Sequence, residues 1–228
     1  MTRSPITIIF DLDGTLIDSA PLCAEILTEM LAERGCDRVV AATDTRSYLT
    51  KGGSQLVTAL LGSDGDETPD DLAAFRDRYA ARPTPADCLF PGVRDGLGTL
   101  SRSGVRMAIC SNKPQHLCDK IVADLSLASF FEVVVGSVPG QTPKPAPDLA
   151  RLALEKLEVG PADCLYVGDS EVDRQTAAAA GIPFLFVAYG YAECDTRIEA
   201  LARCDRFDEL VDFVTQPREI SSIRRRVA

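Results

Sequence analysis

The sequence predicts an α/β protein built on a doubly wound parallel sheet, with a helical insertion early in the chain. Short apolar runs alternate with amphipathic stretches through most of the 228 residues. The first of these runs is separated from the second by far more residues than one connecting helix requires. With 46% hydrophobic and 25% charged residues, the chain has the composition of a globular protein and is long enough to bury a substantial core.

Five apolar runs have the length and the β-branched or aromatic character of buried strands. They lie at residues 6–10, 105–110, 132–136, 164–167 and 183–187. Stretches with helical spacing lie between the later runs, at residues 93–101, 115–125, 146–157 and 172–180. Strands that alternate with helices imply parallel crossovers, so we expect helices on both faces of one sheet. The last stretch, at 198–214, predicts one or two further helices.

The long connection between the first two strands shows no strand-like alternation. Its spacing predicts helices at 21–34, 54–61 and 69–81, separated by turns at Gly35 and at 51–53, 62–65 and 83–85. An insertion of this size is expected to form a small domain of its own. We therefore predict a core domain of residues 1–18 and 87–228 and an inserted helical domain of residues 19–86.

Composition and charge argue against several classes of function. The net charge of −10 argues against binding of duplex nucleic acid, which requires a basic face. It leaves room for a small phosphorylated ligand held by local lysines and a cation. No apolar run approaches the length of a membrane span, and no signal-peptide pattern leads the chain, so we expect no membrane association. None of the eight cysteines forms a C-x-x-C pair, which favours reduced cysteines in a cytoplasmic protein.

The chain has a single histidine, His116, in the first turn of a predicted helix. Catalysis by Ser-His-Asp or Cys-His groups is therefore excluded unless His116 itself serves, and sites with several histidine ligands are excluded outright. A solvated helix residue is the favoured interpretation. For the assembly, a monomer is the default expectation and a dimer the alternative.

The stretch Asp11-Leu12-Asp13-Gly14-Thr15 follows the first apolar run directly. Asp11 and Asp13 would share one side of an extended chain, and Gly14 permits a sharp turn beyond them. Paired carboxylates at the rim of a sheet suit a hard cation such as Mg²⁺, and one carboxylate can attack phosphorus as a nucleophile. The alternative is a strand that ends in an ordinary Asp-Gly turn.

Polar side chains also follow the other predicted strands. Ligands of a parallel α/β sheet bind outside the carboxyl ends of its strands, so these residues are expected to converge on one rim. They are Ser111 and Asn112 after the second run, Lys144 after the third, and Asp169, Ser170 and Asp173 after the fourth. A hydroxyl, an ammonium group and paired carboxylates suit phosphoryl transfer, which depends on charge neutralisation and positioning.

These residues also have structural alternatives. Ser111 can cap the helix that follows it, which is compatible with anion binding at the same helix end. Lys144 can be a surface lysine, as most lysines are. Asp169 and Ser170 can cap the next helix, and Asp173 can be an acid favoured by the dipole in a first helical turn.

Taken together and in this order, the residues resemble the motifs of the haloacid dehalogenase (HAD) superfamily of phosphatases. Asp11-Leu12-Asp13-Gly14-Thr15 is similar to the first motif, Ser111 to the second, Lys144 to the third, and the run from Gly168 to Asp173 to the fourth. The insertion and Ser111-Asn112-Lys113-Pro114 resemble the phosphoglycolate phosphatase-like branch. That branch implies a four-helix cap inserted into a Rossmann-like core.

The resemblance implies an Mg²⁺-dependent phosphomonoester hydrolase that acts through an aspartyl-phosphate. Asp11 would be the nucleophile and Asp13 the acid and base, while Ser111 and Lys144 would hold the phosphoryl oxygens. Mg²⁺ would bind Asp11, Asp13 through its backbone carbonyl, and Asp169, with Asp173 nearby. The phosphate- and substrate-binding residues that it implies are Gly14, Thr15, Lys51, Gly52, Ser111, Asn112 and Lys144.

The substrate stays open on the sequence alone. 2-Phosphoglycolate is favoured, since a cationic Lys51 would suit its carboxylate. Lys51 can equally be a solvated turn lysine, and Thr50 stands where such phosphatases often carry glycine. A β-phosphoglucomutase-like mutase, or a phosphatase for sugar phosphates, nucleotides or pyrophosphate, is the alternative, because the core motifs coincide.

The same residues argue against three other kinds of protein. Asp13 argues against a dehalogenase, which lacks the second acid of the first motif. The neighbours of Lys51 do not resemble the cap motif of a phosphonatase. The intact set of motif residues argues against a silent phosphate-binding module.

Overall fold

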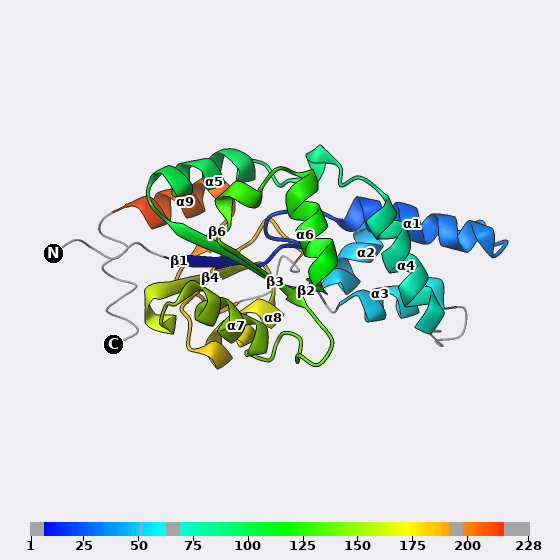
Figure 1. Ribbon diagram of the computed structural model, residues 1–228. Helices are drawn as coiled ribbons and strands as arrows, with labels where there is room; N and C mark the ends of the chain where they lie inside the picture. The colour runs from blue at the N-terminus through cyan, green and yellow to red at the C-terminus, as the bar shows by residue number, and fades with distance from the viewer. Residues whose placement is uncertain (1–6, 51, 63–68, 192–197, 217–228) are drawn as a thin grey trace.

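The computed structural model describes residues 7–50, 52–62, 69–191 and 198–216 (Figure 1). Its centre is a parallel sheet with the strand order β3-β2-β1-β4-β5-β6. The strands are β1 (Thr7–Phe10), β2 (Arg106–Pro114), β3 (Val133–Ser137), β4 (Cys164–Gly168), β5 (Phe184–Val187) and β6 (Arg203–Cys204). Because β1 lies between β2 and β4, the residues after the first strand sit at the middle of the sheet rim.

Helices cover both faces of this sheet, as the predicted doubly wound fold requires (Figure 1). One face packs against α5 (Val93–Arg102), α6 (Gln115–Asp124) and α9 (Phe207–Thr215), and the other against α7 (Asp148–Leu157) and α8 (Glu171–Ala180). Alternate side chains of a strand point to opposite faces, so Ile8 and Phe10 join the first core while Ile9 joins the second. Short 3₁₀ turns complete this part of the chain at Ala86–Cys88, Ala128–Phe130 and Pro161–Asp163.

In the described residues, four helices precede α5 in the long connection between β1 and β2, and they lie beyond the carboxyl ends of the strands (Figure 1). They are α1 (Ala20–Glu33), α2 (Ala42–Leu49), α3 (Gly53–Leu61) and α4 (Pro69–Ala81). The spacing of apolar residues predicts three of them. It misses α2, because that helix is mostly polar and buries Thr45 alone. That these helices form a separate domain of residues 19–86 stays a prediction.

The prediction of further helices at 198–214 is wrong in its first part. Arg203–Cys204 forms a sixth, edge strand beside β5, and α9 begins only at Phe207. Two strand residues are too few to show an alternating pattern. The ring of Phe207 stacks on that of Phe10 with centroids 6.1 Å apart, so α9 packs against the centre of the sheet.

Within the described ranges, none of the helices has both the length and the hydropathy that a membrane crossing demands. The cysteines in those ranges are all free.

Candidate active site

The register of the central strands brings three segments to one point at the rim of the sheet. Phe10 of β1 pairs with Ile109 of β2 and with Val167 of β4, so the residues that follow each of them are neighbours. The Asp11 N–H donates to the Val167 carbonyl over 2.9 Å, which continues the β1–β4 pairing by one residue. The expected convergence of strand ends is therefore present.

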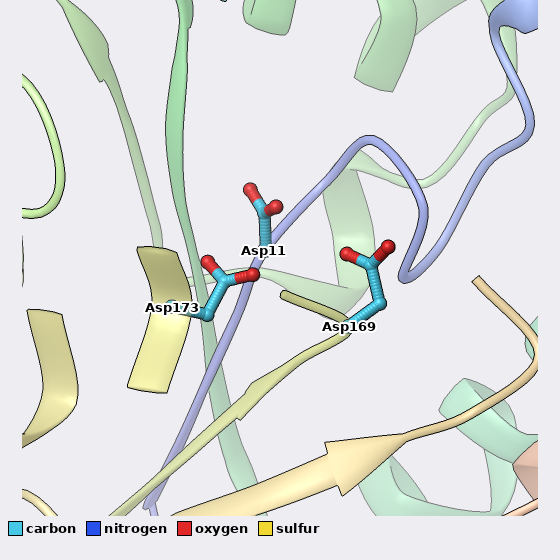
Figure 2. Close-up of side chains that lie close together, drawn as sticks. All are labelled: Asp11, Asp169 and Asp173. Atoms are coloured by element: carbon cyan, nitrogen blue, oxygen red, sulfur yellow. The ribbon is translucent and has the colours of Figure 1, made fainter. Parts of the chain in front are cut away.

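A cluster of three buried carboxylates occupies this point. Figure 2 shows Asp11 after β1, Asp169 after β4 and Asp173 on α8 with their carboxyl groups gathered together. One oxygen atom of each lies within 4.8 Å of the others. A set of carboxylate oxygens at this spacing is the type of site that hard divalent cations bind.

Lys144 is the counter-charge of this cluster. Its Nζ lies 2.8 Å from Asp11 Oδ1 and 2.7 Å from Asp173 Oδ1, and the residue is only 6% exposed. The alternative of a surface lysine is therefore wrong for Lys144. Its two carboxylate neighbours outweigh burial and raise the pKa of the ammonium group. One ammonium group beside three carboxylates leaves the ionised cluster with an excess of negative charge.

The excess charge appears in the pKa values of the acids. Burial, followed by repulsion from Asp173, raises the pKa of Asp11 from 3.8 to about 7, and the attraction of Lys144 offsets this only in part. Burial and the same repulsion raise the pKa of Asp169 well above its usual range. Desolvation and like charge both disfavour the ionised form. A divalent cation fits this site because it would supply the charge that the surrounding residues lack.

Of the three acids, Asp173 is the most fully occupied by its neighbours. Its Oδ2 accepts hydrogen bonds from the backbone and the hydroxyl of Ser170, and its Oδ1 contacts Lys144. Ser170 caps α8 in return, because its hydroxyl accepts from the Asp173 N–H. The capping alternative thus holds for Ser170, whereas Asp169 precedes the cap. Asp173 lies in the first turn of α8, as its own alternative states. Asp11 and Asp169 are left as the acids best placed to bind a cation.

Gly14 leaves the space that Asp169 occupies. A Cβ atom at position 14 would come within 2.3 Å of Asp169 Oδ2, and the backbone there has φ +83°, which favours glycine. The hydroxyl of Thr15 donates to Asp169 Oδ1 over 3.3 Å. Gly14 and Thr15 therefore contact the acidic cluster, and their predicted contact with substrate stays a prediction.

Asp13 has a separate set of partners on the side of the inserted helices. The Ser19 hydroxyl donates to its Oδ1 over 2.5 Å, and Lys113 Nζ lies 3.1 Å from its Oδ2. Lys113 also stands over the ring of Tyr79, 4.6 Å from the centroid. Burial works against the charge of Lys113, but Asp13 and Tyr79 outweigh it, so its pKa is raised. Each carboxylate oxygen of Asp13 therefore has its own partner, Ser19 for Oδ1 and Lys113 for Oδ2.

Ser111 and Asn112 have different roles in the same strand end. The alternative that Ser111 caps α6 is wrong, because β2 continues to Pro114, the N-cap residue. The Ser111 hydroxyl accepts from the Lys113 N–H over 3.2 Å, and among the described residues its own hydrogen has no acceptor. The Asn112 side chain donates to the Lys144 carbonyl and accepts from the Lys144 N–H, over 3.0 and 2.7 Å. Asn112 thereby fixes the loop that carries Lys144.

These groups face a cavity of about 80 Å³ between the rim of the sheet and the inserted helices. Its polar lining from the rim consists of Asp11, Asp13, Ser111, Asn112, Lys113, Lys144, Asp169 and Ser170. Gly52, Arg76 and Tyr79 line it from the inserted helices. The predicted substrate contact Lys51 lies outside the described residues.

A family model described as "Haloacid dehalogenase-like hydrolase" matches residues 8–187. The chain belongs to this hydrolase family. It is 35% identical to a phosphoglycolate phosphatase of Rhodobacter capsulatus over 206 residues, which cover 89% of this chain and 92% of the relative. A plasmid-encoded phosphoglycolate phosphatase of Cupriavidus necator is 38% identical over 81% of both chains. The predicted resemblance to HAD phosphatases is confirmed.

Solved structures agree with the fold of this hydrolase. CbbY from Rhodobacter sphaeroides in complex with phosphate has a TM-score of 0.75 and 26% identity, over 91% of this chain and 96% of the other. A CbbY mutant with bound xylulose-(1,5)bisphosphate has a TM-score of 0.74 and 25% identity over the same shares.

Two groups of residues around the site were missed by the sequence reasoning. Lys113 stands in the second motif, but nothing in its spacing identifies Asp13 as its partner. The other group follows β5. The Tyr191 N–H donates to Asp169 Oδ2 over 2.6 Å, and the Tyr189 hydroxyl donates to the Thr15 carbonyl over 2.8 Å. Both tyrosines lie just beyond the carboxyl end of β5, so the rule that ligands bind at strand ends indicates them from the sequence.

Proposed function

We propose that this hydrolase removes phosphate from a small phosphomonoester, with 2-phosphoglycolate as the favoured substrate, through a phosphorylated Asp11. The observation that carries the proposal is the arrangement of Asp11 and Asp13 in one cavity, each with its own lysine. Asp11 lies beside Lys144 and the acidic cluster, and Asp13 lies beside Lys113 and Ser19. Two carboxyl groups with separate partners can take separate chemical roles.

In the first step, the carboxylate of Asp11 attacks phosphorus and the bond between phosphorus and the leaving oxygen breaks. Asp13, in its protonated form, gives its proton to that oxygen, so the alcohol leaves neutral. Lys144 and the Ser111 hydroxyl stabilise the charge on the phosphoryl oxygens. Asn112 acts through Lys144, since it holds the backbone of that residue.

In the second step, Asp13 takes a proton from water as the water oxygen attacks phosphorus. The bond between phosphorus and the Asp11 oxygen breaks, which releases phosphate and restores both carboxyl groups. Lys113 and Ser19 keep Asp13 facing the cavity through both steps.

Asp11 and Asp169 would hold Mg²⁺, with Asp173 behind them. The excess of carboxylate charge over Lys144 supports this assignment. The ion, when bound, supplies positive charge to the phosphoryl group and to the ionised Asp11.

Two observations support a compact substrate. Relatives that align over most of this chain carry the name phosphoglycolate phosphatase. The cavity of about 80 Å³ is small beside the roughly 300–1,000 Å³ typical of sites for larger ligands, which favours a short ester.

The test is phosphate release from 2-phosphoglycolate by the purified full chain with Mg²⁺. We expect glycolate and phosphate as products, and a turnover at least about 10⁴-fold lower for Asp11→Asn. Asp95→Asn, at an exposed acid in the first turn of α5, is the matched control and should retain full activity. Peptide mass analysis of an acid-quenched reaction should find the phosphate on Asp11. Transfer of phosphate between sugar hydroxyls without net release would replace the proposal by the mutase alternative.

A further inference from the structure

One wall of the cavity is formed by α4, and two polar side chains of this helix lie in that wall. Arg76 and Tyr79 both line the cavity, together with the aromatic ring of Phe75. They are three residues apart and thus share one face of the helix. They line the cavity from the inserted helices, and the Tyr79 ring lies beside Lys113.

Arg76 is a half-buried cation without a partner in the described part of the chain. Within the described ranges, no hydrogen bond or ion pair holds its guanidinium group, whereas the other arginines of those ranges each make at least one. Arg78, two residues along the same helix, pairs with Glu33 on the outer surface. An arginine of α4 thus forms an ion pair where it lies on the outer surface. Arg76, which lines the cavity, forms none within the described residues.

Tyr79 supplies an independent observation. The residue is 1% exposed, and its hydroxyl has no hydrogen-bond partner among the described groups. Buried polar atoms are nearly always satisfied, because desolvation without a partner is unfavourable. Because Tyr79 also lines the cavity, its unsatisfied hydroxyl points to a ligand bound there as the missing partner.

The other cations that line the described part of the cavity are already neutralised. Lys144 contacts Asp11 and Asp173, and Lys113 contacts Asp13. Those lysines belong to the reacting end. Arg76 is left to meet a second negative charge of the substrate.

We propose that Arg76 and Tyr79 form a subsite for a carboxylate that the substrate carries next to its phosphoester. The proposal rests on the proposed phosphatase activity and names the class of substrate: a short phosphorylated hydroxy acid. A guanidinium group matches a planar carboxylate with two parallel hydrogen bonds. A second phosphate is bulkier and carries more charge than one arginine neutralises.

The test compares two substrates that differ only in the second charge. 2-Phosphoglycolate carries a carboxylate, and 2-hydroxyethyl phosphate carries a neutral hydroxyl on the same two-carbon chain. We expect Arg76→Gln to lower kcat/KM for 2-phosphoglycolate about 10- to 100-fold, the value of a lost charged hydrogen bond. The same variant should change kcat/KM for 2-hydroxyethyl phosphate less than about threefold. Arg78→Gln is the matched control and should change neither substrate.

Tyr79→Phe provides the second variant, since it keeps the ring beside Lys113 and removes only the hydroxyl. We expect it to lower kcat/KM for 2-phosphoglycolate selectively, by a smaller factor than Arg76→Gln does. Equal losses on both substrates, or no loss on either, would overturn the subsite. A selective loss on ethane-1,2-diol bisphosphate in place of 2-phosphoglycolate would assign the subsite to phosphate and overturn the carboxylate.

Failure of the phosphatase proposal gives a different result. In that case the unmodified protein would release no phosphate from either ester, or from p-nitrophenyl phosphate. A protein that hydrolyses both esters with an unselective Arg76→Gln variant would retain the phosphatase activity and lose only the subsite.

Discussion

The two sides of the cavity differ in whether their polar side chains already have hydrogen-bond or ion-pair partners. At the sheet rim, Asp11, Asp13 and Asp169 are each held by at least one hydrogen bond or ion pair. On α4, Arg76 and the hydroxyl of Tyr79 have no partner within the described residues. Groups that react must be fixed before the substrate arrives, because catalysis relies on preorganised charge. Groups that recognise a substrate gain most when the substrate is their first partner.

The comparison predicts that breaking a pair at the rim has a large effect. Lys113→Met should lower kcat about 100-fold, since Asp13 loses the cation that orients it. It should also lower the free energy of unfolding by about 1–2 kcal/mol, because the partly buried Asp13 carboxylate is left without its counter-charge. Steady-state kinetics and urea unfolding check both values. Lys120→Met, which breaks a surface pair with Asp124 on α6, is the matched control and should leave kcat unchanged.

A further readout separates positioning of Asp13 from a general loss of structure. The p-nitrophenolate leaving group needs no proton, whereas the alkoxide of 2-phosphoglycolate does. The loss in kcat/KM for Lys113→Met should therefore be several times smaller with p-nitrophenyl phosphate. Identical losses on both substrates would show that Lys113 does not act through Asp13.

The second prediction concerns Mg²⁺ and pH at the same rim. The pKa of Asp11 rises from 3.8 to about 7 in the folded protein, so the metal-free fold binds this proton more tightly than the unfolded chain does. Stability without metal should therefore fall as pH rises toward 7. Mg²⁺ needs the ionised carboxylate, so its apparent affinity should rise over the same range.

Thermal unfolding in EDTA and in Mg²⁺ at pH 6, 7 and 8 tests this linkage. At pH 8 and about 100 times its Kd, Mg²⁺ should raise Tm by roughly 5–10 °C, and less at pH 6. Asp11→Asn should show a flatter pH dependence in EDTA and a smaller rise with Mg²⁺. An equal Mg²⁺ effect at all three pH values would contradict the assignment of Asp11 as a ligand.

The third prediction concerns Asn112, which has no charge and contacts the loop of Lys144 only through its amide. Asn112→Ala should lower kcat/KM about 10-fold and the free energy of unfolding by about 1–2 kcal/mol, because two hydrogen bonds are lost and Lys144 is less fixed. Gln175→Ala removes an exposed amide contact with Glu171 and is the control. If Asn112→Ala lowered the free energy of unfolding by this amount but left kcat/KM unchanged, Asn112 would have only a structural role.

The sequence predicts the rim better than it predicts the α4 wall, and the reason is physical. Strand ends are marked by a change from apolar to polar residues, and parallel topology alone brings Asp11, Ser111 and Asp169 together. Lys144 follows from the same rule. Which lysine pairs with which acid depends on side-chain packing, so the pair of Lys113 and Asp13 is absent from the pattern.

Elements without a strong period are also lost to sequence reasoning. Helix α2 buries almost nothing, and the strand Arg203–Cys204 is too short to alternate. On α4, Tyr79 reads as one more apolar position of an amphipathic helix. Only the packed structure distinguishes a core tyrosine from one whose hydroxyl is unsatisfied at a cavity.

The smallest expected effect is a gain in stability, whereas the other variants are expected to lose stability or activity. It therefore distinguishes the α4 wall from the sheet rim most directly. Tyr79→Phe removes a buried hydroxyl that has no partner among the described residues, while the ring stays in place beside Lys113. Relief of that desolvation should raise the free energy of unfolding by about 1 kcal/mol, or Tm by about 2–4 °C, without ligand. Saturating 2-phosphoglycolate should reduce this gain, because the ligand stabilises only the hydroxyl form through the lost contact. A destabilised Tyr79→Phe protein would mean that the hydroxyl is satisfied within the fold, and the α4 wall would then resemble the rim.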